Sequence, residues 1–327
     1  MAKSRTSEEL RVGRQTISLS NPDKVLFPDD GITKRELAGY YQAVAPVMLP
    51  YLKDRPLSLA RYPDGIGGER IFQKNAGRHF PDWLPRAEVS KAGGELCQVL
   101  AAKPADLVYL ASQAAIELHA LASRLGHLRE PDQLIFDLDP PGTGHFDGVR
   151  RAALRLREIL DGDLGLTSYV KTTGSKGLHV VVPLAAREDV DAVREFARGV
   201  AQVLAAAEPE LITLEQRKDA RDGLIYADIM RNGYAQTAVA PYSVRARPGA
   251  PVAAPLSWDE VADPGLRPDR FTIRDVGARL DQLARDGDPW AGMPRHRYGL
   301  SQPRQKLARL ATSATGASRG TSTEGPG

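Results

Sequence analysis

The sequence predicts an α+β protein in which mixed β-sheets are flanked by helices. Short apolar runs of about four to eight residues, such as L-I-F-D-L-D from Leu134, are typical of buried strands. Longer stretches repeat with the helical period, as in F-D-G-V-R-R-A-A-L-R-L-R-E-I-L from Phe146. A Gly-rich segment lies between two strand-like runs over residues 55–74 and predicts a β-hairpin.

The composition limits the kind of protein and its surroundings. The chain has 327 residues, a length that allows about two domains, and 42% of them are apolar, enough to bury a sizeable core. A net charge of +3 and a pI of 8.9 are compatible with a nucleic-acid partner without requiring one. The single Cys97 excludes an intramolecular disulfide and fits a reducing cytoplasm. No signal-peptide pattern and no membrane-length apolar run occurs, so we expect a cytoplasmic protein without a membrane partner.

The N-terminal part is predicted to contain a strand, a helix and the hairpin. Residues 1–14 are polar, and we expect them to be disordered. A strand in T-I-S-L-S and a turn in N-P-D-K-V-L-F-P precede Thr33, which can cap a helix that starts near Lys34. The hairpin carries Arg61 and Phe72. Phe72 is either a core residue or a platform on which a base stacks.

The middle and C-terminal parts add further helices and a tail. Residues 105–128 are predicted as a short strand, D-L-V-Y-L, followed by a helix that carries His119, where a lone histidine is more often structural than catalytic. Further helices are expected over residues 189–207 and in T-I-R-D-V-G-A-R-L-D-Q-L-A-R-D-G. Residues 301–327 end in a low-complexity stretch and are expected to be disordered, which leaves residues 15–300 as one domain.

Two carboxylates, Asp137 and Asp139, lie on the central apolar run. Side chains two residues apart on a strand share a face, so both should point the same way, with Leu138 buried on the other side. Two like charges this close repel each other unless a cation lies between them. Carboxylate oxygens suit Mg²⁺ or Mn²⁺, which also bind phosphates. The alternative is that the aspartates only end the strand in solvent before the Pro-Pro pair.

A turn rich in glycine, hydroxyl and lysine side chains follows, in Y-V-K-T-T-G-S-K-G-L-H-V-V-V-P. Such a turn can cradle phosphates, as a metal-bound triphosphate beside the carboxylates would require. A third carboxylate, Asp228, lies within L-I-Y-A-D-I-M and is costly to bury without a cation. Arg245 and Arg247 are predicted on one strand face, where they suit phosphate or carboxylate or else form a solvated basic edge.

In many ordered blocks the chain closely resembles the polymerase domain of bacterial non-homologous end-joining ligases, within the archaeo-eukaryotic primase superfamily. The likeness extends from about Ile17 to Trp290. It is carried by N-P-D-K-V-L-F-P, G-I-T-K, R-P-L-S-L-A-R-Y-P-D-G, F-Q-K, I-E-L-H, F-D-L-D-P, T-T-G-S-K-G-L-H, A-D-I-M-R-N and A-P-Y-S-V-R-A-R-P-G-A-P. The resemblance implies the primase-polymerase fold, with catalytic carboxylates on central strands. The K-x-D-G motif of a DNA ligase does not occur, so a standalone polymerase is expected.

The resemblance also implies roles for individual residues. Asp137, Asp139 and Asp228 are expected to hold two Mn²⁺ or Mg²⁺ ions. The residues expected to bind the nucleotide are Arg61, Phe72, His119, Thr173, Ser175, Lys176, His179 and Arg245. The residues expected to bind DNA are Asn21, Lys24 and Lys34, at a 5′-phosphate, and Arg221, on a loop that reaches the template.

Two-metal nucleotidyl transfer is the chemistry that these residues imply. The ions would lower the pKa of the attacking 3′-hydroxyl and stabilise the leaving pyrophosphate, while cationic side chains neutralise the phosphates. The family implies Mn²⁺ preference and a preference for ribonucleotides. Its implied partners are gapped or broken DNA with a 5′-phosphate, NTP or dNTP, Ku and a separate ATP-dependent DNA ligase. A monomer associated with the nucleoid is expected.

Three of the matching segments depart from the family pattern. Thr173 replaces a serine, Ile71 replaces the first of two aromatics, and Ala-Leu replaces Pro-Trp after I-E-L-H. Three alternatives to end joining stay open. One is gap filling in excision repair, and another is a non-catalytic module that binds DNA ends. The third is a haloacid-dehalogenase-like phosphatase, in which Asp137 would be the nucleophile and Asp139 the general acid.

Overall fold

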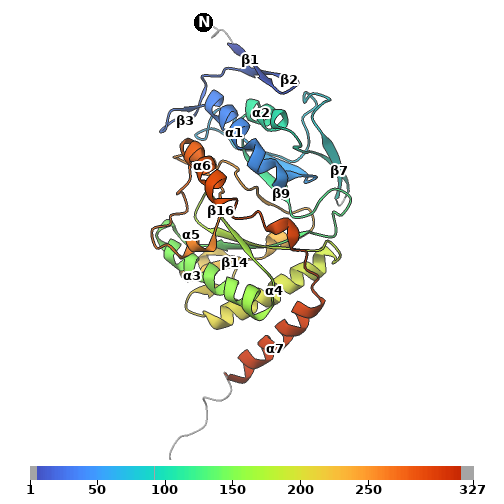
Figure 1. Cartoon of the computed structure of the whole chain (residues 1–327), viewed down its shortest axis with the longest axis vertical. Coiled ribbons are helices and arrows are strands. Elements are labelled where there is room, and N and C mark those ends of the chain that lie inside the picture. The colour runs from blue at the N-terminus through green and yellow to red at the C-terminus, as the bar shows by residue number, and fades with distance from the viewer. Residues whose placement is uncertain (1–5, 92, 318–327) are drawn as a thin grey trace, which may run out of the picture.

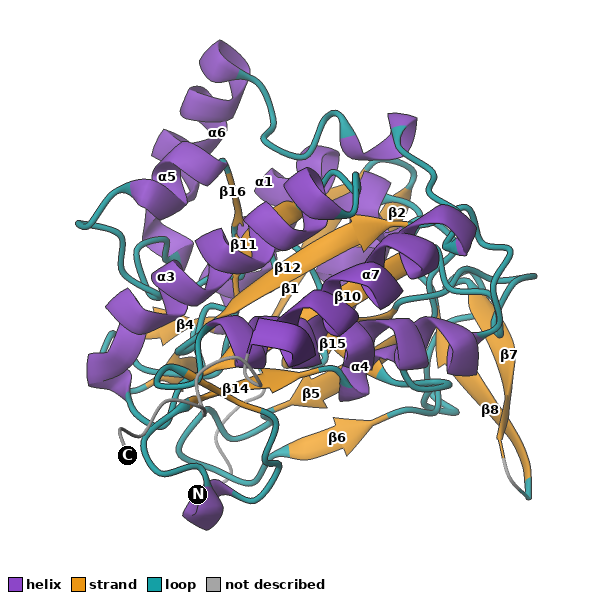
Figure 2. Ribbon diagram, turned by 90° about the horizontal axis from the view of Figure 1, so that it is seen from below, coloured by secondary structure: helices purple, strands orange, loops and turns teal. Residues whose placement is uncertain are grey.

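Two six-stranded sheets face each other across the middle of the molecule, and each carries helices on its outer side (Figures 1 and 2). The computed structural model describes residues 6–91 and 93–317. All strand pairs are antiparallel among these residues, except that β13 (Ile212–Thr213) and β14 (Ile225–Asp228) run parallel. The predicted α+β class is confirmed.

The first sheet has the strand order β13–β14–β10–β12–β11–β16. Its remaining strands are β10 (Gln133–Asp139), β12 (Leu178–Pro183), β11 (Tyr169–Thr172) and β16 (Pro255–Leu256). The outer face of β10 buries Leu134, Phe136 and Leu138 in a core shared with α3 (Phe146–Arg157) and α4 (Val190–Ala207). Because strand side chains alternate, the inner face receives Ile135, Asp137 and Asp139. The predicted common face of the two aspartates is therefore confirmed.

The second sheet has the order β15–β9–β5–β8–β7, with β6 also paired to β5. Its strands are β15 (Thr237–Val239), β9 (Ala115–Leu121), β5 (Leu57–Arg61), β8 (Gly94–Val99), β7 (Arg86–Lys91) and β6 (Ile71–Gln73). α1 (Lys34–Leu52) and α2 (Pro104–Ser112) cover this sheet. The hydroxyl of Thr33 accepts from the Glu36 N–H and begins α1 as predicted. The β5–β6 hairpin also confirms its prediction.

A smaller core joins the two sheets at their facing sides. It contains Ile135 and Val181 from the first sheet, Ala238 from the second, and Trp290 from the C-terminal segment. The Trp290 indole N–H donates to the Val170 carbonyl at 2.9 Å, so this segment is fixed to β11. The cavity described below opens beside this junction.

Helices and short strands complete the described chain. They are β3 (Val25–Phe27), β4 (Ile32–Thr33), α5 (Trp258–Ala262), α6 (Val276–Asp286), a π-helical turn at Glu158–Asp163, and 3₁₀ turns at Thr143–His145, Lys218–Ala220, Met230–Asn232, Ile273–Asp275 and Met293–Arg295. The helices predicted over residues 189–207 and near the C-terminus are confirmed by α4 and α6.

The secondary structure predicted for residues 105–128 is wrong, because helix and strand occur in the opposite order. Pro104 occupies the first position of α2, and the Asp106 carboxylate accepts from the N–H groups of Ala102 and Lys103. Ala114 then takes a positive φ of 56°, and β9 follows. His119 consequently lies on a central strand instead of a helix.

The disorder predicted for both termini is also wrong within the described residues. Ser7–Val12 forms β1, which pairs with β2 (Gln15–Ser20) from Ser7↔Ser20 to Val12↔Gln15. Ser301–Ala317 forms α7, which packs Leu307 against the core of the first sheet. The remaining parts of those predictions, residues 1–5 and 318–327, lie outside the described residues.

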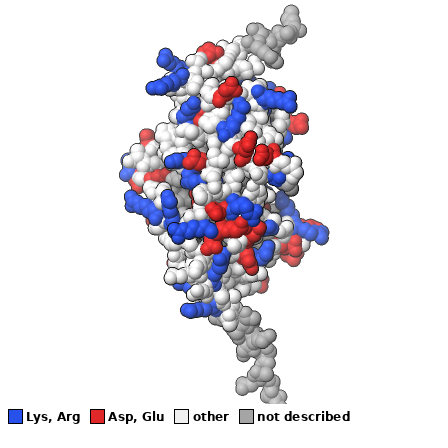
Figure 3. Space-filling view, turned by 90° about the vertical axis from the view of Figure 1, so that its right-hand side faces the viewer, with Lys and Arg blue, Asp and Glu red and all other residues white. Residues whose placement is uncertain are grey.

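Basic and acidic side chains are interspersed on the face of the molecule drawn in Figure 3, and neither sign of charge covers that face. This agrees with the small net charge of +3. No helix within the described ranges is long and apolar enough to cross a bilayer.

Candidate active site

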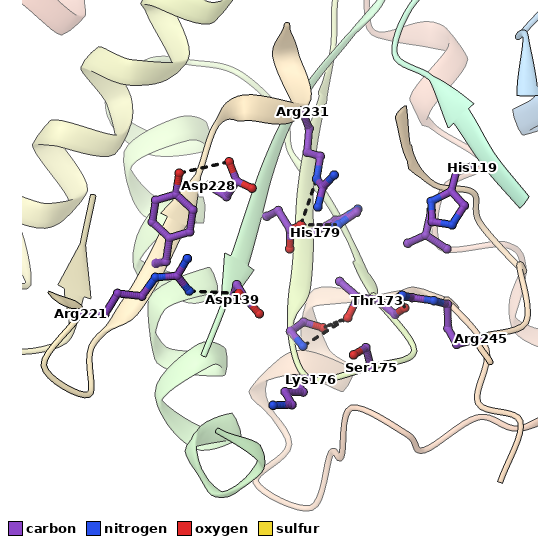
Figure 4. Close-up of a pocket in the computed structure, with 14 residues that line it drawn as sticks. His119, Asp139, Thr173, Ser175, Lys176, His179, Arg221, Asp228, Arg231 and Arg245 are labelled. Carbon is purple, nitrogen blue, oxygen red and sulfur yellow. Dashed lines mark hydrogen bonds and ion pairs between the residues drawn. The ribbon is translucent and has the colours of Figure 1, made fainter. Parts of the chain in front are cut away.

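A cavity of about 210 Å³ lies between the facing sides of the two sheets (Figure 4). It brings together all three predicted aspartates and most of the predicted nucleotide-binding residues. Its lining comprises His119, Asp137, Asp139, Thr173, Ser175, Lys176, Gly177, His179, Arg221, Tyr226, Asp228, Arg231, Val239 and Arg245.

Four ionisable side chains form one row across the inner face of the first sheet. Strand register places Lys171 opposite His179, His179 opposite Asp137, and Asp137 opposite Asp228. Directly opposed side chains on one face lie close together, so the row is electrostatically coupled. Asp139 follows on the same face of β10, opposite Tyr226. The sequence predicted the aspartates but not the register that aligns them with Lys171.

Arginines hold two of the three carboxylates (Figure 4). The Arg231 Nε lies 3.3 Å from Oδ2 of Asp137, and the Arg221 Nη1 lies 3.1 Å from Oδ2 of Asp139. Asp228 accepts instead from the Met230 N–H at 2.7 Å. Arg231 was not predicted as a site residue, and its position three residues after Asp228 is the only signal of it in the sequence.

The protonation of the carboxylates follows from these contacts. Burial alone would raise the pKa of Asp137, but His179, Arg231 and Lys171 outweigh it and lower the pKa. Burial and the neighbouring Asp137 raise the pKa of Asp228, despite its bond from Met230. Two like charges on opposed strands thus favour one ionised and one more readily protonated carboxylate.

Lys171 and His179 are both buried beside the cavity, and each has a side-chain nitrogen without a hydrogen-bond partner among the described residues. These nitrogens are the Lys171 Nζ and the His179 Nδ1. Burial lowers the pKa of Lys171 to about 7, and Arg245 acts in the same direction. Burial also lowers the pKa of His179 to about 4, with a further contribution from Lys171. His179 is therefore neutral near pH 7, and because its Nε2 lies 3.4 Å from Oδ2 of Asp137, its single hydrogen faces that carboxylate and Nδ1 can only accept.

The predicted phosphate-binding turn connects β11 to β12. The Thr173 N–H donates to the Gly177 carbonyl at 3.0 Å, and the Thr173 hydroxyl bonds the same residue, which closes the turn. A Cβ on Gly177 would lie 2.1 Å from the Leu138 carbonyl oxygen, so only glycine lets the turn approach β10 this closely. Ser175 and Lys176 line the cavity at the tip of the turn.

His119 and Arg245 form the wall opposite the carboxylates (Figure 4). Arg245 donates from Nη1 to the Thr173 carbonyl at 2.6 Å, which ties it to the turn. The prediction that Arg245 and Arg247 share a strand is wrong, because that segment is a loop in which the Arg247 N–H bonds the Arg245 carbonyl. Arg247 faces two neighbouring cavities instead.

The predicted platform Phe72 is exposed over 41% of its surface at the edge of this wall. Its ring centre lies 5.6 Å from that of His119, in an edge-on arrangement, and the Arg70 guanidinium lies 5.0 Å from it. Phe72 is thus free of the core, which favours the stacking interpretation over the packing one. Ile71 beside it is similarly exposed.

Arg61 does not line the cavity, contrary to its predicted place in the nucleotide site. Its guanidinium donates to the Gln113 carbonyl and to the Gln73 side chain, each at 2.8 Å. Burial lowers the pKa of the Lys34 ammonium, and the nearby cations Lys24 and Arg61 lower it further. Arg61 therefore belongs to the surroundings of Lys34.

The three residues predicted for a 5′-phosphate are brought together away from the cavity. The Lys24 N–H donates to the Asn21 carbonyl, and the Lys34 N–H donates to the Lys24 carbonyl. The Lys34 ammonium is nearly buried and donates to the Ser20 carbonyl at 2.8 Å. The Lys24 ammonium bonds Asp64 at 2.7 Å. The sequence-distant residues therefore form one basic cluster.

Arg221, predicted to reach the template, is buried and points into the cavity. Besides Asp139, it donates to the carbonyls of Glu215 and Gln216, and its guanidinium lies 4.3 Å from the Tyr226 ring centre. In this arrangement Arg221 balances the charge of Asp139 instead of projecting outward.

The carboxylates fit hard divalent ions by chemistry, although they do not form a closed cluster. Within the described parts of the chain, no three His, Cys, Asp or Glu side chains form a group that could hold a metal ion. The three carboxylates line one cavity, and there Arg221 contacts Asp139 and Arg231 contacts Asp137. All three donors are oxygens on two adjacent strands, and the opposed pair Asp137 and Asp228 repel each other, which a cation would relieve.

The fold has a close counterpart among solved structures. The polymerase domain of ligase D from Mycobacterium tuberculosis, solved in complex with DNA, superposes with a TM-score of 0.78 at 34% identity. The match covers 87% of this chain and 100% of that domain. The fold and its carboxylate-lined cavity therefore define a member of the archaeo-eukaryotic primase superfamily.

Sequence comparison narrows this to one family. A family model for the primase-polymerase domain of LigD matches residues 33–290. The chain is 38% identical over 270 residues to the multifunctional non-homologous end joining protein LigD of Mycolicibacterium smegmatis, covering 82% of this chain and 35% of that protein. It is 32% identical over 275 residues to the bifunctional LigD of Bacillus subtilis, covering 84% of this chain and 43% of that protein.

The chain belongs to the LigD primase-polymerase domain family. It spans about a third to two fifths of the length of these relatives. The phosphatase alternative is excluded by this assignment.

Proposed function

We propose that this protein adds nucleotides to the 3′ end of DNA at breaks or short gaps, in non-homologous end joining. The observation that carries the proposal is the cavity in which Asp137, Asp139 and Asp228 face the turn that holds Ser175 and Lys176. Carboxylates opposite a phosphate-binding turn suit a triphosphate whose α-phosphorus is attacked while pyrophosphate leaves.

Each wall of the cavity has a separate task in this proposal. The turn would bind the phosphates through the hydroxyl of Ser175 and the ammonium of Lys176, and Arg245 would add a guanidinium from the opposite side. Neutral His179 would line the phosphate site without adding charge, with its Nε2 facing Asp137. Phe72 would stack on the base at the cavity edge.

Two divalent ions, Mn²⁺ or Mg²⁺, would be held by Asp137, Asp139 and Asp228. When bound, such ions activate the 3′-hydroxyl and stabilise the leaving pyrophosphate. Arg221 and Arg231 would then balance the carboxylates only in the absence of the ions, because guanidinium and metal ion use the same oxygens.

The remaining expectations concern substrates and partners. Ribonucleotides are proposed as the preferred substrates, and Ku and a separate ATP-dependent DNA ligase as partners at the nucleoid. The relatives named above are end-joining proteins, which supports this setting. Side-by-side kinetics with each NTP and dNTP would contradict the sugar preference by showing a clear deoxy preference.

Primer extension with Mn²⁺ and labelled nucleotide tests the reaction itself. We expect template-dependent addition to a 3′ end next to a short gap, and none without a divalent ion. DNA binding without any nucleotide addition, over a range of ions and templates, would support the non-catalytic alternative instead.

A further inference from the structure

Glu117 is a buried carboxylate for which the proposed reaction has no task. It lies on β9, between β15 and β5 in the second sheet, two residues before His119 and on the same face. Its side chain is only 6% exposed. A carboxylate buried this deeply must be well paired to be tolerated.

Both oxygens of Glu117 are occupied by residues of the cavity wall. Oε2 accepts from the Nε2 of His119 at 3.0 Å, and Oε1 accepts from the Nε of Arg245 at 3.0 Å and from the Ala246 N–H at 3.1 Å. Burial alone would raise the pKa of Glu117, but His119 and Arg245 outweigh it and lower the pKa. The charged carboxylate can only accept, so the His119 ring carries its hydrogen on Nε2.

These contacts connect the two sheets. His119 belongs to the second sheet, whereas Arg245 also donates to the Thr173 carbonyl of the turn in the first sheet. Glu117 thus fixes the Nε edge of Arg245 and leaves its remaining N–H groups directed at the turn and the cavity. It also sets which His119 nitrogen is free to meet a ligand.

Glu117 is not placed to touch the nucleotide itself. It does not line the carboxylate cavity, and it borders a second cavity on the far side of Arg245. A carboxylate would also repel a triphosphate at close range. Any effect of Glu117 on nucleotide binding must therefore pass through its two partners.

We propose that Glu117 is a positioning residue for the nucleoside triphosphate, which holds Arg245 in the orientation that receives the phosphates and keeps His119 with its acceptor nitrogen, Nδ1, free. This inference rests on the proposed function, since it assigns a task within the same nucleotide site. It predicts that the charge and length of Glu117 matter for nucleotide affinity more than for the rate of the bound complex.

Glu117→Gln tests this with little change of shape. If its amide oxygen keeps the bonds to Arg245 and Ala246, the bond that orients Arg245 is no longer between charged groups, and the amide NH₂ that faces His119 removes Nδ1 as an acceptor by moving the ring hydrogen there. We expect the KM for nucleotide to rise about tenfold, as for a lost hydrogen bond to a charged group, while kcat changes less than about threefold. Glu117→Asp keeps the charge and should recover part of the affinity.

A double-mutant cycle separates positioning from general destabilisation. In a His119→Ala/Arg245→Ala background, Glu117→Gln should raise the KM no further, because its partners are gone. The matched control is Glu260→Gln, which removes a similar carboxylate bonded to Arg279 at 2.6 Å outside the cavity lining. It should lower thermal stability without changing the KM for nucleotide.

The outcomes distinguish this inference from the proposed function. Wild-type protein that neither binds nor adds nucleotide would contradict the function and the inference with it. If the wild type is active but neither Glu117 variant changes the KM for nucleotide, the role of Glu117 is overturned and the proposed function stands. The same holds if Glu117→Gln raises the KM equally in the wild type and in the His119→Ala/Arg245→Ala background. If Glu117→Gln unfolds, the KM of Glu117→Asp decides the question, measured at a temperature where circular dichroism shows it folded.

Discussion

At the scale of single residues, the site is a row of charges that the strand register brings together. Lys171, His179, Asp137 and Asp228 follow one another across four neighbouring strands. Each is buried or half-buried, so each pKa depends on the next residue in the row. A substitution in this row therefore changes the protonation of its neighbours as well as removing one group.

Replacing Asp137 should stop nucleotide addition without preventing DNA binding. Asp137→Asn keeps the shape of the side chain but removes the charge that faces Arg231 and His179. We expect the extension rate to fall by about a hundredfold or more, the scale of losing one transition-state-stabilising group. DNA affinity should stay within about threefold of wild type, since net negative charge is lost. Exposed Asp263→Asn is the control, and near-wild-type extension by Asp137→Asn would refute the assignment.

Buried His179 should make the protein less stable in mild acid. Its pKa is about 4 in the folded state, below the ordinary value of about 6.5. Above pH 6.5 neither state is protonated and the stability is complete. Between pH 6.5 and 4 only the unfolded chain gains the proton, so the free energy of unfolding falls by up to about 3 kcal/mol.

Urea unfolding at several pH values, without divalent ions, measures this loss. His179→Gln should show a smaller fall in unfolding free energy over the same pH window, because it cannot take up the proton. Parallel curves for wild type and variant would show that His179 does not titrate as inferred.

At the scale of elements, local signals predicted some segments well and others poorly. Thr33 with Glu36 caps α1 by contacts within four residues, so the sequence contained the whole signal. The segment A-I-E-L-H-A-L alternates like a strand but is also apolar enough for a helix, and the sheet around β9 decides between them. Arg231 and Glu117 were missed because their partners are set by contacts between distant segments.

The helix α7 should contribute to stability but not to nucleotide addition. Leu307 is 9% exposed and packs against α4, where a Cβ on Gly199 would lie 2.9 Å from its Cδ2. Leu307→Ala should lower the free energy of unfolding by about 1–3 kcal/mol, the lower part of the range for buried leucine because the site is at an edge. Leu125→Ala, at a leucine that is 44% exposed, should cost less than about 0.5 kcal/mol.

Chemical denaturation of these two variants gives the comparison, with primer extension as the second measurement. An equal cost for both leucines would mean that α7 is not held against α4 in solution. A loss of extension by folded Leu307→Ala would mean that α7 has a part in the reaction.

At the scale of the whole molecule, the two candidate binding regions lie on different elements. The carboxylate-lined cavity uses the facing sides of both sheets, whereas Asn21, Lys24 and Lys34 cluster at the start of α1. DNA with a gap presents a 3′ end and a downstream 5′-phosphate at once, so a rigid protein could bind both ends of the gap. Lys34 occupies the first turn of α1, where the helix dipole also favours an anion.

The basic cluster should therefore recognise a terminal 5′-phosphate, which carries more charge than an internal one. Lys24→Ala with Lys34→Ala should remove the preference for gapped DNA with a downstream 5′-phosphate, at about 1–3 kcal/mol as for hydrogen bonds to charged groups. Addition on a simple primer-template should persist, because the carboxylate cavity shares none of these residues.

The Lys53→Ala control removes a lysine that follows the other end of α1 and should keep the preference. Titrating wild type and the variants against phosphorylated and unphosphorylated gaps gives two affinities for each protein. If the double variant keeps the wild-type ratio of these affinities, both lysines make only general phosphate contacts, whose strength falls with salt equally on both substrates.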